Sequence, residues 1–196
     1  MVPATHRAFV DESSTLRAPA QQEYLVAAAI LAAGRCDEVR EALRPLLLPG
    51  QIKVHWRDER DRRRFALVDA IRELEPVNVV IAHRSAPSRK TERFRRKCLE
   101  QVYIELSAMD TFDITLESRG ASQDSQDRAH IVALQGQSMD ARMRIAHQRG
   151  GDEPLLWIPD IVLGAVNSAH DGDRRYLDAI AGTVMIHRTT EGLPGL

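Results

Sequence analysis

A run of ten almost uniformly apolar residues, Glu23 to Ala32, constrains the fold of this chain most strongly. The run reads Glu-Tyr-Leu-Val-Ala-Ala-Ala-Ile-Leu-Ala and is typical of a strand that is buried on both faces. Its alanines leave a helix open as the alternative. A strand of this kind needs further strands beside it and helices over it. The sequence therefore predicts a layered α/β protein.

Predicted strands and helices alternate along the rest of the chain. Strands are predicted at residues 6–11, 51–56, 77–82, 112–117 and 143–147. Helices are predicted at residues 35–46, 58–74, 89–109 and 173–186. Two more helices are predicted to begin at residue 126, with Asp124 as the cap, and at residue 159. This order favours a mixed central sheet flanked by helices, with functional groups at the strand ends. The length predicts one domain over residues 1–196, with a frayed tail from about 187.

Composition restricts the setting more than the function. Apolar residues make up 43% and charged residues 28%, as in ordinary globular proteins, and the net charge of −1 indicates no partner. Cys36 and Cys98 have neither paired spacing nor a disulfide framework, which favours a reduced cytoplasmic setting. We find no signal peptide and no apolar run of the roughly 18 residues needed to span a bilayer. The sequence predicts no membrane partner.

Several well-known motifs are absent. The chain has no G-x-x-x-x-G-K, G-x-G-x-x-G, G-x-S-x-G or H-E-x-x-H sequence. None of its seven histidines stand four residues apart, so a helical zinc pair is not expected.

Carboxylates at the ends of predicted elements remain as candidates. Asp11 and Glu12 lie at the end of the first strand. Glu117 follows the strand at residues 112–116, and Asp160 begins a helix. Oxygen ligands of this kind suit Mg²⁺ or Mn²⁺. Simpler interpretations stay open, because Asp and Ser favour turns, a Glu can close a strand, and a helix dipole stabilises an Asp in its first turn.

The order of these pieces resembles a known family. Its members begin with a strand ending in Asp-Glu-Ser and close with a Leu-x-x-x-Asp segment that opens a helix. The matching pieces here are Phe9–Ser13, the long second strand, Ile114–Glu117 and Leu155–Ala165. The chain is thus similar to an uncharacterised bacterial family of the ribonuclease H-like superfamily.

This resemblance implies a metal-dependent nuclease site. It places Asp11, Glu117 and Asp160 around two divalent ions, with Glu12 as ligand or support; two ions can activate water and stabilise the leaving oxygen of a phosphodiester. Glu117 stands where an Asp is more usual. Around residue 53, relatives often carry a Glu, but this chain has Lys53 there. Asp58 or Glu59 would have to supply the missing carboxylate.

Basic residues indicate a possible nucleic-acid surface. Six of the nine residues from Arg89 to Lys97 are basic, and those expected to contact a phosphate backbone are Arg89, Lys90, Arg93, Arg96 and Lys97. A solvated helix face would look the same. A second basic cluster, Arg57 to Arg64, is interrupted by acids and fits intrahelical ion pairs equally well. An aromatic content of 5% disfavours a stacking platform for single strands.

Three functions stay open on the sequence alone. The first is a divalent-metal-dependent nuclease that uses Asp11, Glu12, Glu117 and Asp160. The second is a catalytically silent module of the same fold that binds nucleic acid or protein, for which the missing acid near residue 53 is the main argument. The third is a phosphoester hydrolase acting on a small nucleotide.

Overall fold

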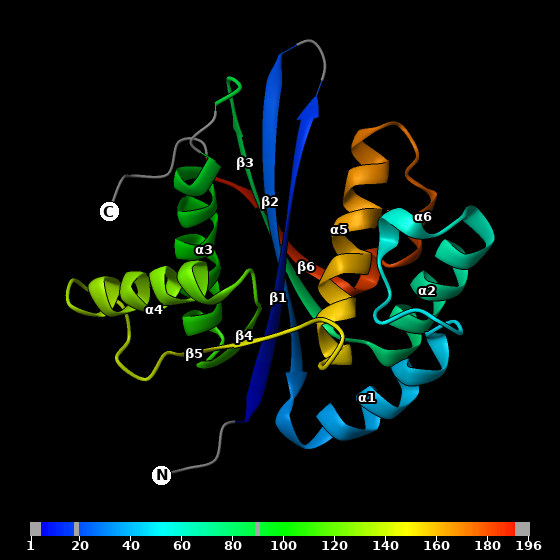
Figure 1. Cartoon of the computed structure of the whole chain (residues 1–196), viewed down its shortest axis with the longest axis horizontal. Helices are drawn as coiled ribbons and strands as arrows, with labels where there is room; N and C mark the ends of the chain where they lie inside the picture. Colours follow the sequence, from blue (N-terminus) through cyan, green and yellow to red (C-terminus); the bar gives the residue numbers. More distant parts are fainter. Residues whose placement is uncertain (1–4, 18–19, 89–90, 191–196) are drawn as a thin grey trace.

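The strands form one mixed sheet in the computed structural model, which describes residues 5–17, 20–88 and 91–190. They are β1 (His6–Arg17), β2 (Gln21–Ala32), β3 (Val77–Ser85), β4 (Asp113–Glu117), β5 (Arg144–Gln148) and β6 (Val184–Thr189), in the spatial order β5-β4-β1-β2-β3-β6 (Figure 1). The β1–β2 and β2–β3 pairs are antiparallel, and the β1–β4, β4–β5 and β3–β6 pairs are parallel. The predicted mixed sheet is confirmed.

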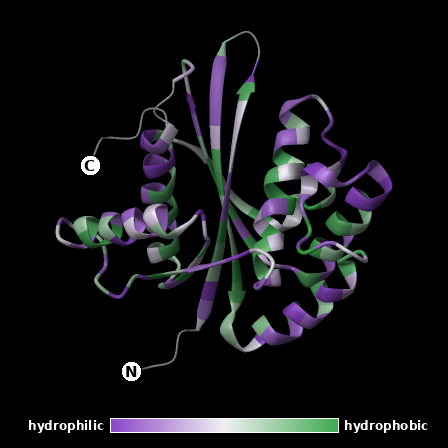
Figure 2. Cartoon of the chain, in the orientation of Figure 1, coloured by the Kyte–Doolittle hydropathy of each residue, from purple (hydrophilic) through white to green (hydrophobic). Residues whose placement is uncertain are grey.

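Helices cover both faces of this sheet. They are α1 (Cys36–Leu43), α2 (Asp61–Leu74), α3 (Thr91–Ala108), α4 (Ala121–Gln135), α5 (Trp157–His170) and α6 (Arg175–Ala179). Figure 1 shows α3 and α4 on one face and α1, α2, α5 and α6 on the other. Figure 2 colours many residues of the central strands and of α5 as hydrophobic. The buried apolar residues form a separate core on each face of the sheet. No helix within the described ranges is both long and apolar enough to cross a membrane.

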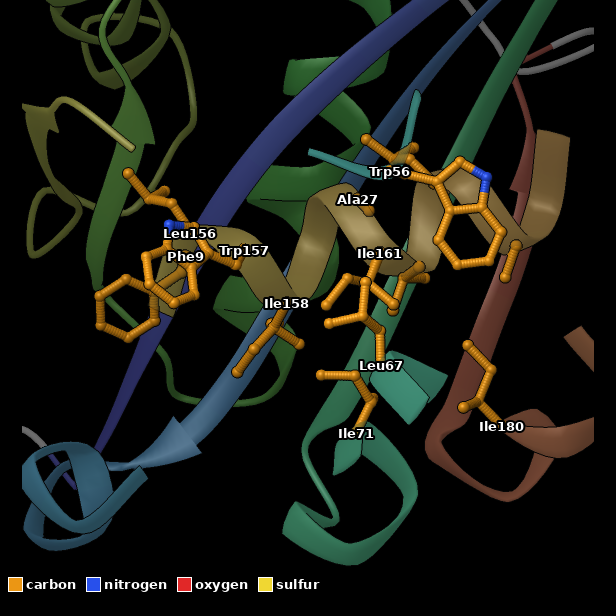
Figure 3. Close-up of a cluster of buried hydrophobic side chains, with 14 of the residues drawn as sticks. Phe9, Ala27, Trp56, Leu67, Ile71, Leu156, Trp157, Ile158, Ile161 and Ile180 are labelled. Atoms are coloured by element: carbon orange, nitrogen blue, oxygen red, sulfur yellow. The ribbon is translucent and has the colours of Figure 1, made fainter. Parts of the chain in front are cut away.

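The apolar run identified in the sequence is the centre of the sheet. In β2 every residue from Gln22 to Leu31 is buried, and alternate side chains belong to the two cores. On the α5 face, β1 contributes Phe9 to a core that also contains Trp157, Ile158 and Ile161 (Figure 3). Burial of α5 is complete from Trp157 to Val166, so this helix is held firmly against the sheet.

The first strand is longer than predicted. It continues through Asp11 and Glu12 to Arg17, and Asp11 pairs with Ala27 of β2 and Glu12 with Val26. The interpretation of Asp11 and Glu12 as a turn is wrong, because β2 extends alongside and supplies backbone hydrogen-bond partners for these polar residues. The strand that ends at this level is β4, whose last pair with β1 is Val10 with Leu116.

Three other predicted elements are wrong. Residues 51–56 form a loop that leads into a short 3-10 turn at Trp56–Asp58, not a strand. The fourth helix begins at Ala121 rather than 126, because Asp124 bonds backward to the Ser118 hydroxyl and the Arg119 N–H instead of capping. The helix predicted over 173–186 is instead α6, a 3-10 turn and β6. Residues 187–189 of the predicted frayed tail belong to β6, and residues 191–196 lie outside the described part of the chain.

Candidate functional site

Asp11 and Glu117 lie on neighbouring parallel strands at the level where β4 ends. The last β1–β4 pair, Val10 with Leu116, immediately precedes both residues. Side chains alternate between the faces of a strand. Asp11 therefore shares a face with Phe9, which packs in the core beneath α5, and Glu117 lies two residues after Thr115 on that face.

Asp160 reaches this region from the first turn of α5. Its Oδ1 lies 2.9 Å from His55 Nδ1, and its Oδ2 accepts a hydrogen bond of 2.7 Å from the Trp56 N–H. The helix dipole favours a carboxylate at this position. Asp160 is thus fixed both by its helix and by the loop that precedes α2.

The loop at residues 51–56 is attached to α5 by a close contact between Trp56 and Gly164. A Cβ atom at position 164 would lie 2.0 Å from the indole ring of Trp56, so a side chain there requires the ring to move. The ring of Tyr176 in the core meets that of Trp56 edge-on, with the ring centroids 5.0 Å apart. Gly164 lies one turn after Asp160, and the same helix face therefore accepts the ring and the backbone N–H of Trp56.

Lys53 brings a positive charge to the same place. Its Nζ lies 2.5 Å from Oε1 of Glu117. Of the two candidate replacements for an acid near residue 53, Asp58 is exposed, and Glu59 is buried against Gln51 and Arg63. The sequence marked Lys53 only as a departure from the family, and its partner could not be read from the sequence.

The charges of these groups act on one another. Burial and then repulsion from Glu117 and Asp160 raise the pKa of Asp11 well above its usual range, while Lys53 offsets part of this effect. The hydrogen bond to Asp160 raises the pKa of His55. Burial opposes the charged form of Lys53, but its bond to Glu117 raises its pKa overall.

Glu12 lies on the other face of the sheet. It forms an ion pair with Arg95, whose side chain is only 2% exposed, and its other oxygen lies 3.4 Å from Arg119. Arg95 also binds both oxygens of Asp127, with the Nη2–Oδ2 bond at 2.9 Å. Glu12 is therefore separated from Asp11 by the strand itself and belongs to an arginine network beneath α3 and α4.

The two faces meet at a pocket beyond the end of β4. Asp11 and Glu117 line it from one side, and Glu12, Arg95 and Arg119 line it from the other. A crevice outside the carboxyl end of a strand is a common place for a ligand in sheets of this type. The pocket thus offers carboxylates and guanidinium groups to one ligand.

A second acidic group lies within the arginine network. Among the described residues, the group whose ligand atoms all lie within 4.8 Å of one another consists of Asp124, Asp127 and His147. Arg95 binds Asp127, and the Arg119 N–H binds Asp124. Asp127 is thus ion-paired with Arg95, and Asp124 accepts hydrogen bonds from the Ser118 hydroxyl and the Arg119 N–H, so both carboxylates already have protein partners.

The three predicted ligands fit a hard divalent cation. Asp11, Glu117 and Asp160 offer only oxygen donors, and the hydrogen bonds to Asp160 leave a lone pair on each oxygen. The raised pKa of Asp11 shows that added positive charge would be favourable. Among the described residues, the oxygens of Asp11, Glu117 and Asp160 do not all lie within 4.8 Å of one another, whereas the ligand atoms of Asp124, Asp127 and His147 do. The Lys53 ammonium would compete with an ion at Glu117.

The basic segment of α3 is divided between surface and interior. Arg93, Arg96 and Lys97 are exposed, whereas Arg95 is buried. Arg89 and Lys90 lie outside the described residues. In the second basic cluster, Arg63 pairs with Glu59 four residues earlier and Arg64 lies 4.9 Å over the Trp56 ring, as expected for local stabilisation.

The chain is similar to several solved structures, among them two RNase H proteins. One is RNase HII in its complex with PCNA from Archaeoglobus fulgidus, with a TM-score of 0.48 and 16% identity over 85% of this chain and 78% of that one. The other is Bst-RNase HIII in complex with Mn²⁺, with a TM-score of 0.46 and 12% identity over 89% of this chain. The matched part is 52% of the latter chain. No family model and no curated protein matches the sequence.

The strand order and pairing directions define the class of fold. A central β3-β2-β1-β4-β5 arrangement has β2 antiparallel to its neighbours and parallel β1, β4 and β5, with one further strand, β6, added beside β3. Helices flank both faces. The protein has an α/β ribonuclease H-like fold, as predicted.

Proposed function

We propose that this protein is a divalent-metal-dependent nuclease of the uncharacterised bacterial family that its motifs resemble. The observation that carries the proposal is the meeting of three carboxylates from separate elements, Asp11 on β1, Glu117 at the end of β4 and Asp160 at the start of α5. Their mutual repulsion is what raises the pKa of Asp11 beyond the effect of burial. Carboxylates held together in this way are stabilised by a divalent cation.

Asp11, Glu117 and Asp160 would hold the metal, for which Mg²⁺ and Mn²⁺ are the candidates. Such an ion supplies Lewis acidity towards a phosphodiester and lowers the pKa of a bound water. The protein orients the ligands: His55 and the Trp56 N–H fix the Asp160 carboxylate, and the ladder between β1 and β2 fixes Asp11. Glu12 acts as support through Arg95 rather than as a ligand.

The direct test is hydrolysis of nucleic acid by the purified protein. We expect single-stranded, duplex or RNA–DNA hybrid substrate to be cleaved when Mn²⁺ or Mg²⁺ is present, and the activity to disappear with excess EDTA. A dinucleotide in the same panel separates a nuclease from a small-nucleotide hydrolase. Absence of cleavage with every polynucleotide in either metal would contradict the proposal.

Contact with nucleic acid is proposed for the exposed face of α3. Arg93, Arg96 and Lys97 lie on it, in a chain whose net charge of −1 gives no general attraction to polyanions. We propose that the preceding Arg89 and Lys90 extend this surface. A phosphate backbone that contacts basic residues releases counterions, so binding must weaken as salt increases.

Salt dependence checks this surface. For Arg93→Ala combined with Lys97→Ala, we expect the slope of log K against log salt to fall by about two, because each lost phosphate contact removes about one unit. Fluorescence anisotropy with labelled oligonucleotides from 50 to 300 mM salt measures the slope. The double variant Arg142→Ala with Arg144→Ala, on the β5 side, serves as the charge-matched control. Equal slopes for the α3 variant and the wild type would assign α3 to the solvated surface.

A silent binding module is the second candidate function. The observation that favours it is the Lys53–Glu117 ion pair, since an ammonium group occupies one oxygen of a proposed ligand. Nucleic-acid binding without any metal-induced stabilisation or cleavage is the result this alternative predicts.

The proposal includes one domain over residues 1–196 and a reduced, cytoplasmic setting. Cys36 and Cys98 are buried free thiols, and they belong to the cores on opposite faces of the sheet. A disulfide between them would have to cross β-strands, so the two thiols favour reducing conditions.

A further inference from the structure

One loop supplies polar partners to two of the three proposed metal ligands. Within residues 51–56, Lys53 places its ammonium 2.5 Å from Glu117 Oε1, and His55 and the Trp56 N–H bind the two oxygens of Asp160. The side chains of Lys53 and Glu117 are 33% and 19% exposed, so their ion pair is partly shielded from water. Shielding strengthens the attraction between opposite charges.

The Lys53–Glu117 pair is also held by packing. A Cβ atom at position 150 would lie 2.7 Å from Glu117 Oε1 and 2.8 Å from Lys53 Cδ, so a side chain there would require these two side chains to shift. Trp157 fixes the turn that contains Gly150, because its indole N–H donates a hydrogen bond of 2.6 Å to the Gly150 carbonyl. Lys53 thus lies in a place that the backbone of this turn and the core of α5 keep open for it.

We propose that the Lys53 ammonium is an internal counter-ion of this site, which competes with divalent metal for Glu117 and so sets the metal affinity. The proposal rests on the proposed metal site. A divalent ion at Glu117 would lie beside the ammonium and be repelled by it. Lys53 must therefore withdraw when metal binds, and its flexible four-carbon stem permits that movement. Removing the charge removes the competitor while leaving the carboxylates in place.

Lys53→Met tests this competition because methionine preserves most of the stem that packs over Gly150 and carries no charge. We expect Mn²⁺ to bind at least about tenfold more tightly than to the wild type, by isothermal titration calorimetry and by loss of the free Mn²⁺ EPR signal. In EDTA the same variant should melt below the wild type, because the carboxylates lose their counter-ion. Arg128→Met, which removes an exposed charge on α4, should leave both quantities unchanged.

Lys53→Gln provides a second uncharged variant, so the outcome does not depend on one protein folding well. Tighter Mn²⁺ binding by either variant supports the inference. If the wild type binds Mn²⁺ and both variants bind it equally well or more weakly, Lys53 is a structural ion-pair partner and the inference is wrong, while the proposed function stands. If neither the wild type nor the variants bind Mn²⁺, the proposed metal site itself is wrong, and the inference with it.

Discussion

Arg95→Ala should lower the free energy of unfolding by about 3–5 kcal/mol, the usual result of breaking a buried ion pair by removing one partner. The Arg95 side chain is 2% exposed and binds both Asp127 and Glu12. Alanine would leave these two carboxylates without their main cation, on a face of the sheet where Asp127 is only 3% exposed. Urea denaturation at pH 7 measures the effect.

The pH dependence gives this prediction a second readout. Burial alone would raise the pKa of Asp127, but hydrogen bonds from His147 and Arg95 lower it to about 2. A carboxyl whose folded pKa lies below its unfolded value of about 3.9 stabilises the protein above that value, and the contribution is lost as the pH falls from about 4 to about 2. Arg95→Ala should therefore show a smaller acid-induced loss of stability than the wild type.

Arg93→Ala is the matched control for Arg95→Ala, since Arg93 is an exposed arginine on the same helix. It should change the unfolding free energy by less than about 0.5 kcal/mol. A loss below 1 kcal/mol for Arg95→Ala itself would contradict the role assigned to the network, and Glu12 would then be free to act elsewhere.

Asp11→Asn should abolish metal-dependent cleavage, with a loss of at least about 10³-fold in kcat. Asparagine keeps the size of the side chain but removes the negative charge that a hard cation requires. The stability of the metal-free protein should rise, since burial and the repulsion from Glu117 and Asp160 oppose a charged Asp11 in the folded state. The stabilisation by Mn²⁺ that the wild type gains through mass action should disappear.

Cleavage rates and melting temperatures with and without Mn²⁺ distinguish this role from a structural one. Asp113→Asn, at the opposite end of β4, is the control and should retain both activity and metal response. An Asp11→Asn protein that melts lower than the wild type without metal, and still cleaves, would show that Asp11 is a structural residue.

The sequence predicts the mixed sheet because the sheet depends on local pattern and on chain order, whereas the choice of Asp11, Glu117 and Asp160 as ligands stays a prediction. The apolar run in β2 can only be buried between two layers, and helices at period 3.6 supply those layers. The sequence predicts Asp11 at the rim of the sheet on the assumption that β1 ends there. In the structure β1 continues, and the rim is formed by the end of the neighbouring strand β4. The residues of β1 alone do not reveal where its neighbour ends.

The partners of these carboxylates depend on long-range packing. Lys53 meets Glu117 from 64 residues away, and Trp56 meets Asp160 from 104 residues away. Nothing in the loop sequence specifies either contact, although the glycines at 150 and 164 mark places of close approach once the fold is known. Arg95 illustrates the same limit, since its neighbours in sequence, Arg96 and Lys97, are exposed whereas it is buried.

Anomalous diffraction from crystals soaked in Mn²⁺ tests the central claim most directly, because it locates the ion itself. The account predicts a peak within ligand distance of the Asp11 carboxylate and of Glu117 or Asp160, with Lys53 moved away from Glu117. A peak at Asp124, Asp127 and His147 alone, or no peak at a Mn²⁺ concentration that supports cleavage, would contradict it.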